Sequence, residues 1–166
     1  MCPEVGFWQA KAIEFDQEIK ALERKIIESA DPTRIPKDVG SLTAALLGGE
    51  MLDWSRFKNR RQAGSYTGLC PSEYSSGGKR IQGSINKHGN PRIRHLLIEA
   101  AWRLVFWQPN YPPVKRIFEG NAKRMRKRAI VAVARKLAID LWRIETGQCN
   151  AKKLGLELKT GVLSAS

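Results

Sequence analysis

Two serines stand beside a glycine pair in a strongly basic stretch of this 166-residue chain. The stretch runs Tyr74-Ser75-Ser76-Gly77-Gly78-Lys79-Arg80 and continues through Lys87-His88-Gly89-Asn90-Pro91-Arg92-Ile93-Arg94, and no Asp or Glu occurs between Glu73 and Glu99. Small hydroxyl groups on a glycine hinge among cations are suited to bind a phosphate group. The chemistry that this spacing favours is therefore chemistry on a phosphate.

A serine hydroxyl can attack a DNA phosphodiester and form a phosphoserine link if cations stabilise the charge that develops on phosphorus. Cations that stand near Ser75 and Ser76 in the sequence are Lys79, Arg80, Lys87, Arg92 and Arg94. From composition alone, the alternative is a flexible basic loop that only contacts phosphates. Both interpretations make the stretch a nucleic-acid contact.

Other catalytic arrangements fit the sequence less well. Only two histidines occur, His88 and His95, and neither has a carboxylate near it in sequence, which argues against a Ser-His-Asp triad. The segment before Lys79 lacks the spacing of a P-loop. The acidic residues after Trp54 are isolated, so we expect no metal site in this chain.

The net charge of +13 is unevenly distributed along the chain. Residues 1–53 carry ten acidic residues and six Lys or Arg, whereas residues 54–166 carry six acidic residues and twenty-three Lys or Arg. The second part is thus the part that would meet a polyanion such as DNA or RNA. Three separated cysteines, Cys2, Cys70 and Cys149, favour a reducing compartment, and no apolar run has the length of a membrane span, so we expect a cytoplasmic protein without membrane association.

The elements that would position these residues are mainly helical. Apolar residues recur at spacings of three and four from Val5 to Ile26, which predicts a coiled-coil helix over residues 1–30, or a helix that lies on its own domain. Further predicted helices span 42–47, which Ser41 would cap, then 56–67, a helix that starts at Asn90-Pro91, and 122–146 with Gly147 as its C-cap. Glycines predict a hairpin or ordered loop between Gly68 and Asn90, and Gln108–Pro113 is expected to be a non-helical connector.

The predicted final helix is basic at its start and apolar all round in its middle. Residues 129–134 are therefore expected to be buried, and the basic start adds further candidate nucleic-acid ligands: Lys123, Arg124, Arg126, Lys127 and Arg128. Residues 148–166 carry little pattern and are expected to be a tail. The fold class is mainly α, with a long N-terminal helix and a compact helical domain bearing a small hairpin.

Several blocks resemble, in order, the C-terminal domain of insertion-sequence transposases related to the pilin-gene invertase Piv, which include bridge-RNA-guided recombinases. The resemblance covers about residues 35–145, and we delimit the domain as 35–147. The blocks are Leu42–Leu47, Arg56–Lys58, Gln62–Pro71, Tyr74–Arg80, Lys87–Arg94, Leu96–Trp102 and Lys127–Leu137.

The resemblance implies that Ser76 is the nucleophile joined to DNA, with Ser75 as second choice. It also implies that the first helix is a coiled coil used to form a homo-oligomer, a dimer or tetramer, and that a guide RNA is a candidate partner besides DNA.

The sequence departs from the family at two points. The family's Pro-Gly-x-Gly turn appears as Pro36-Lys37-Asp38-Val39-Gly40. The family also carries an N-terminal RuvC-like domain whose four carboxylates hold Mg²⁺, and this chain begins at the predicted coiled coil. We therefore expect Mg²⁺ only from a RuvC-like partner domain and expect the chain not to transpose alone. The alternative function is a non-catalytic nucleic-acid-binding or transposase-interacting module.

Overall fold

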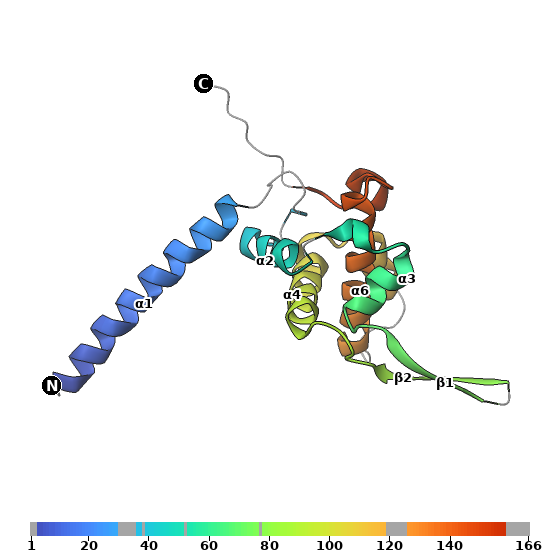
Figure 1. Cartoon of the computed structure of the whole chain (residues 1–166), viewed down its shortest axis with the longest axis horizontal. Helices are drawn as coiled ribbons and strands as arrows, with labels where there is room; N and C mark the ends of the chain where they lie inside the picture. Colours follow the sequence, from blue (N-terminus) through green and yellow to red (C-terminus); the bar gives the residue numbers. More distant parts are fainter. Residues whose placement is uncertain are drawn as a thin grey trace, which may run out of the picture.

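A computed structural model of the chain describes residues 3–29, 36–37, 39–51, 53–76, 78–118 and 126–158. It is mainly helical, with a long first helix, a helical body and a single two-stranded hairpin in the described part (Figure 1), as the sequence predicts. The elements in chain order are α1 (Pro3–Glu28), α2 (Ser41–Met51), η2 (Trp54–Arg56), α3 (Arg60–Tyr66), β1 (Pro71–Ser76), β2 (Lys79–Ile85), α4 (Pro91–Trp107), α5 (Pro112–Phe118), α6 (Arg126–Glu145) and η4 (Ala151–Leu154).

Helix α1 extends away from the body and contacts it at α2 (Figure 1). Its predicted apolar stripe is exposed to solvent from Val5 (50%) to Leu22 (58%), whereas Ile26 at its end is partly buried. Most of the stripe therefore does not pack on its own domain, which is one of the two interpretations of the sequence. The coiled coil itself stays a prediction.

Helices α4 and α6 pack against each other and form the centre of the core. Helix α4 buries Ile93, Leu97, Ala100 and Leu104, whereas Trp107 in its last turn is exposed. These four residues are buried together because the helical period places residues three, four and seven positions apart on one face of the helix.

Most of the apolar middle of α6 is buried, including Ile130 and Val133. Ala132, however, is exposed and Val131 is only partly buried, so the expectation that residues 129–134 are all buried is wrong at these two positions. The small methyl group of an alanine exposes little apolar surface, so the sequence can place it on the solvent side at little cost.

Two helix boundaries differ from the sequence prediction. Helix α2 continues through Gly48 and Gly49 to Met51, although each glycine costs up to about 1 kcal/mol in a helix. Burial of Leu47 and Met51 offsets that cost. The predicted helix 56–67 is divided into η2 and α3, because Asn59 caps α3 by accepting the N–H groups of Arg61 and Gln62.

The prediction that Pro112 and Pro113 cannot be helical is also wrong. Both lie in the first turn of α5, where a backbone N–H has no partner within the helix and a proline is tolerated. Gly147 adopts a φ of +70° two residues after the last residue of α6, as expected for a glycine that ends a helix. The predicted start of that helix at 122 lies outside the described residues.

The segment after Gly147 carries more structure than its sequence indicates. Ala151 and Leu156 are buried, and Leu158 forms an isolated antiparallel bridge with Pro36. The buried side chain of Gln108 joins both strands of this bridge: its Nε2 donates to the carbonyl of Lys37 (2.6 Å) and its Oε1 accepts the N–H of Glu157 (3.1 Å). The segment has too few apolar residues to form a detectable period, so its sequence does not predict that it packs on the body.

Among the described residues, no helix combines the length and apolar character that crossing a bilayer requires.

Candidate nucleic-acid interface

The predicted hairpin or loop is a β-hairpin that projects from the body (Figure 1). Strands β1 and β2 are antiparallel, with Tyr74 opposite Ile81, Ser75 opposite Arg80 and Ser76 opposite Lys79. The backbone therefore places the predicted nucleophile at the last residue of β1, and two of the predicted cations, Lys79 and Arg80, at the first two positions of β2. Gly78 in the turn has a φ of +80°, a conformation that glycine adopts without strain.

The base of the hairpin is held by a close approach of two glycine backbones. A methyl group at Gly89 would overlap the amide nitrogen of Gly68 and the carbonyl oxygen of Tyr66. Gly68 itself has a φ of +67°. The N–H of Lys87 donates to the carbonyl of Gly68 (3.2 Å), so the chain entering β1 and the chain leaving β2 are joined.

Arg94 and Lys87 meet at the same base. The Nη1 atom of Arg94 donates to the carbonyl of Lys87 (3.3 Å), and Lys87 has a φ of +57°, which is uncommon for a residue with a side chain. The side chain of Lys87 is exposed and that of Arg94 is partly buried. The hydrogen bond to the Lys87 carbonyl therefore restricts the conformation of the Arg94 side chain, whereas the side chain of Lys87 is exposed at the surface.

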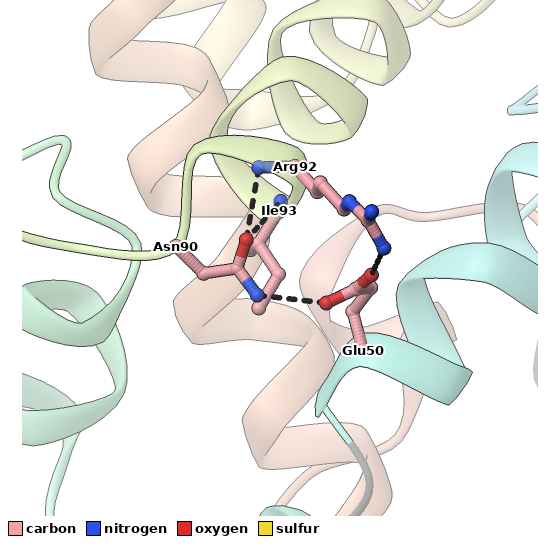
Figure 2. Close-up of polar contacts among 4 residues, drawn as sticks. All are labelled: Glu50, Asn90, Arg92 and Ile93. Atoms are coloured by element: carbon pink, nitrogen blue, oxygen red, sulfur yellow. Dashed lines mark hydrogen bonds and ion pairs between the residues drawn. The ribbon is translucent and has the colours of Figure 1, made fainter.

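The start of α4 confirms the predicted cap at Asn90 with Pro91 after it. The Oδ1 atom of Asn90 accepts the N–H groups of Arg92 (2.9 Å) and Ile93 (3.5 Å). Its Nδ2 atom donates to Oε2 of Glu50 (2.7 Å), and Nη1 of Arg92 lies 3.2 Å from Oε1 of the same carboxylate (Figure 2).

Glu50 is the residue of this candidate interface that sequence reasoning missed. It comes from α2 and is separated from Arg92 by 42 positions, so no local pattern connects the two. The stretch that lacks acids in sequence thus has a carboxylate beside it in space. The hydrogen bond from Asn90 and then that from Arg92 hold the pKa of Glu50 below its ordinary value of 4.5.

The remaining predicted ligands stand apart or lack a described side chain. Lys127 and Arg128 are exposed in the first turn of α6. Lys123 and Arg124 lie outside the described residues, and Ser76, Lys79, Arg80 and Arg126 are described through their backbone alone. The structure therefore brings Lys87 and Arg94 together at the hairpin base, whereas it pairs Arg92 with Glu50 of α2 and places the α6 cations on a separate element.

Arg56, by contrast, has a packing role. Its guanidinium group lies 4.7 Å from the ring centre of Phe57 and 4.3 Å from that of Tyr66. Such cation–π contacts fix the end of α3, which leads to Gly68. In the described part of the chain, no three His, Cys, Asp or Glu side chains gather in a way that could hold a metal ion.

Gly89→Ala tests the close approach at the hairpin base. The added methyl group meets backbone atoms that cannot rotate away, so we expect a loss of about 1–3 kcal/mol in the free energy of unfolding. Gly48→Ala is the matched control, because nothing lies within 4 Å of its added methyl group and the change favours the helix by about 0.5–1 kcal/mol. Urea unfolding followed by circular dichroism measures both, and equal effects of the two substitutions would contradict the tight contact.

Glu50→Gln tests the carboxylate through its pH dependence. A lowered pKa means that ionised Glu50 stabilises the fold above its ordinary pKa and loses this contribution as the pH falls through the lower folded-state value. We expect Glu50→Gln to be less stable than the unmutated protein at pH 7 and to approach its stability near pH 3. Glu99→Gln, an exposed position on α4, makes the same change in charge. A stability difference that persists unchanged at acid pH would argue against the ionised contact.

Comparison with known proteins connects this interface to a family. Residues 36–115, which include the hairpin and the start of α4, match the model of the transposase IS116/IS110/IS902 family. The chain is 36% identical over 111 residues to a putative transposase, y4rJ, of Sinorhizobium fredii, covering 64% of this chain and 28% of that protein.

Two further relatives are named as transposases of insertion sequences. The transposase for insertion sequence element IS1111A of Coxiella burnetii is 33% identical over 144 residues, which is 83% of this chain and 39% of the relative. The transposase for insertion sequence element IS1328 of Yersinia enterocolitica is 32% identical over 111 residues, which is 65% of this chain and 33% of the relative. The chain thus spans between 28% and 39% of the length of these three relatives. Over residues 36–115 it is therefore similar to a region of the transposases of the IS116/IS110/IS902 family.

Proposed function

We propose that this chain is the part of a transposase that carries the nucleophile, and that the hydroxyl of Ser76 attacks a DNA phosphodiester during insertion-sequence transposition. The observation that carries the proposal is the backbone position of Ser76, at the turn of a projecting hairpin and opposite Lys79. This hairpin lies inside the region that matches the transposase family. A projecting element can reach a phosphate in a duplex that the body itself does not enclose.

The proposed reaction exchanges one phosphate ester for another. The oxygen of Ser76 forms a bond to phosphorus, one P–O bond to a deoxyribose breaks, and the released DNA hydroxyl takes up a proton in place of the one that serine gives up. Because the bond energy is retained in the phosphoserine link, a later attack by a DNA hydroxyl can reverse the step without an external energy source. Positive groups near the phosphate stabilise the charge of the transition state.

Three cations are the candidate charge stabilisers: Lys79, Arg80 and Arg92. Lys79 and Arg80 follow the turn directly, and Arg92 lies in the first turn of α4. Lys87, Arg94 and the basic start of α6 would hold DNA, or a guide RNA, through backbone phosphates.

The described residues do not offer a carboxylate cluster that fits Mg²⁺. In the family that the sequence resembles, that ion belongs to a RuvC-like domain, and no step proposed for this chain passes through it.

Ser76→Ala tests the proposed chemistry. In a mixture of the full chain, a separately supplied RuvC-like domain of the family and duplex DNA, we expect the unmutated protein to give a covalent protein–DNA adduct on a denaturing gel. Ser76→Ala should abolish the adduct and leave DNA affinity nearly unchanged, since a neutral hydroxyl contributes little to binding a polyanion.

Ser75→Ala is the matched control, one residue away on the same strand. It should still form the adduct. An adduct that survives Ser76→Ala would assign the nucleophile elsewhere, and the absence of any adduct from the unmutated protein would favour a non-catalytic nucleic-acid-binding or transposase-interacting module.

We further propose that α1 pairs with a second copy of the chain as a coiled coil. The stripe of exposed apolar side chains along it supports this, because such a stripe in water favours burial against a partner. The stripe consists of Val5, Trp8, Phe15, Ile19 and Leu22, with charged residues between them.

Ile19→Glu tests this pairing, because a charge within the stripe would be costly to bury. Light scattering should give a multiple of the 18.7 kDa chain mass for the unmutated protein and a single chain for Ile19→Glu. Gln17→Glu introduces the same side chain at a position outside the stripe and should leave the mass unchanged. A monomeric unmutated protein at tens of micromolar concentration would rule the pairing out.

A further inference from the structure

A basic pocket lies at the end of the body opposite to the hairpin. It has a volume of about 340 Å³ and is formed where α5, the second half of α6 and η4 meet. In Figure 1 the segment that follows α6, at the red end of the colour bar, lies at the opposite end of the body from β1 and β2. The pocket is lined by Pro112, Pro113, Arg116, Lys136, Asp140, Lys153 and Leu154.

Among the described residues that line the pocket, Asp140 is the one acid, and its neighbours balance its charge. The side chain of Asp140 is 2% exposed, and it accepts hydrogen bonds from the hydroxyl of Tyr111 (2.7 Å) and from Nζ of Lys136 (2.9 Å). Nη1 of Arg143 lies 3.6 Å from the same carboxylate. Burial and the nearby charge of Asp140 raise the pKa of Tyr111 far above its usual range, so its hydroxyl stays a donor.

The two other cations of the pocket are available to a ligand. Arg116 and Lys153 are exposed, and neither forms an ion pair with another residue that the structure describes. Lys136 keeps 41% of its side chain exposed although it contacts Asp140. Cations from three different elements thus border a small pocket whose acid is already satisfied.

The position of η4 against α5 is fixed by the backbone. Gly155 has a φ of +71°, and a methyl group there would lie 2.8 Å from Cδ of Pro112. The side chain of Asn150 caps η4 by accepting the N–H of Lys152 (3.2 Å). Lys153 therefore lies in an ordered 3₁₀ turn that packs against α5.

We propose that this pocket binds a backbone phosphate of a nucleic acid, as a second contact remote from the hairpin. An anion with several acceptor oxygens can accept from Arg116, Lys136 and Lys153 together, and charge-assisted hydrogen bonds of this kind are the strong ones. The net charge of +13 favours a polyanion over an isolated anion. The inference shares with the proposed function only the premise that the chain binds nucleic acid. The residues of the pocket are different from those of the hairpin.

Lys153→Ala and Lys152→Ala form a matched pair for the test. They remove the same charge from adjacent positions of η4, but Lys153 borders this pocket and Lys152 does not. We would measure binding of the full chain to a 20-base-pair DNA duplex, and separately to an RNA hairpin, by fluorescence anisotropy at several salt concentrations.

We expect Lys153→Ala to weaken binding about three- to tenfold and to reduce the salt slope by about one, as the loss of one phosphate contact does. Arg116→Ala should act in the same way from α5, whereas Lys152→Ala should change both quantities less. The probe that shows the larger difference between the paired variants identifies DNA or RNA as the source of the phosphate.

Equal effects of Lys152→Ala and Lys153→Ala on both probes would overturn the proposal, since only net charge would then act. Failure of the unmutated chain to bind either probe would overturn it as well. The covalent adduct of Ser76 distinguishes this failure from that of the proposed function: loss of the pocket contact leaves adduct formation possible, and absence of the adduct leaves the salt slopes measurable.

Discussion

The contact between the backbones of Gly68 and Gly89 is the constraint on which the candidate interface depends. These residues precede β1 and follow β2, and they come so close that neither position has room for a methyl group. With the base closed in this way, and with the N–H of Lys87 bonded to the carbonyl of Gly68, the two strands leave the body together. The register between them then places Ser76 opposite Lys79. A substitution at Gly68 or Gly89 would therefore displace the turn of the hairpin, although neither residue contacts that turn.

Two carboxylates, Glu50 and Asp140, organise the cations of this chain in the same manner. Each accepts from an uncharged donor, Asn90 in one case and Tyr111 in the other, and each also pairs with a basic side chain. A shared carboxylate orients a cation while it reduces the local repulsion among like charges. The basic surface is therefore a pattern of partly compensated charges, and a phosphate that binds Arg92 must compete with Glu50 for it.

The parts of the structure that depend on local sequence could be predicted. The long first helix follows from apolar residues at heptad spacing, the start of α4 follows from Asn90-Pro91, and the hairpin follows from its glycines. These features are decided by residues within a few positions of one another. The same applies to the candidate site, in which Ser76 and its flanking cations are neighbours in sequence, although their roles stay proposals.

The parts that depend on distant residues could not be predicted. The contact of Glu50 with Arg92 joins residues on two helices, and the passage of α2 through Gly48 and Gly49 is favoured by burial of Met51. The turn η4 packs through only a few residues, among them Ala151 and Leu156. In each case tertiary packing outweighs a weak local preference, and a single sequence does not contain the partner's position.

The length of α1 has a geometric consequence for any paired assembly. Its 26 residues make an arm of about 39 Å, at 1.5 Å per residue. If two copies aligned their arms in parallel, the two bodies would stand side by side and their hairpins could address one stretch of duplex. An antiparallel alignment would hold the bodies at opposite ends of the arm, at a separation of about eleven base pairs of B-DNA, counted at 3.4 Å each. The relative direction of the two helices would thus decide whether the two bodies stand beside each other or about one helical turn of DNA apart.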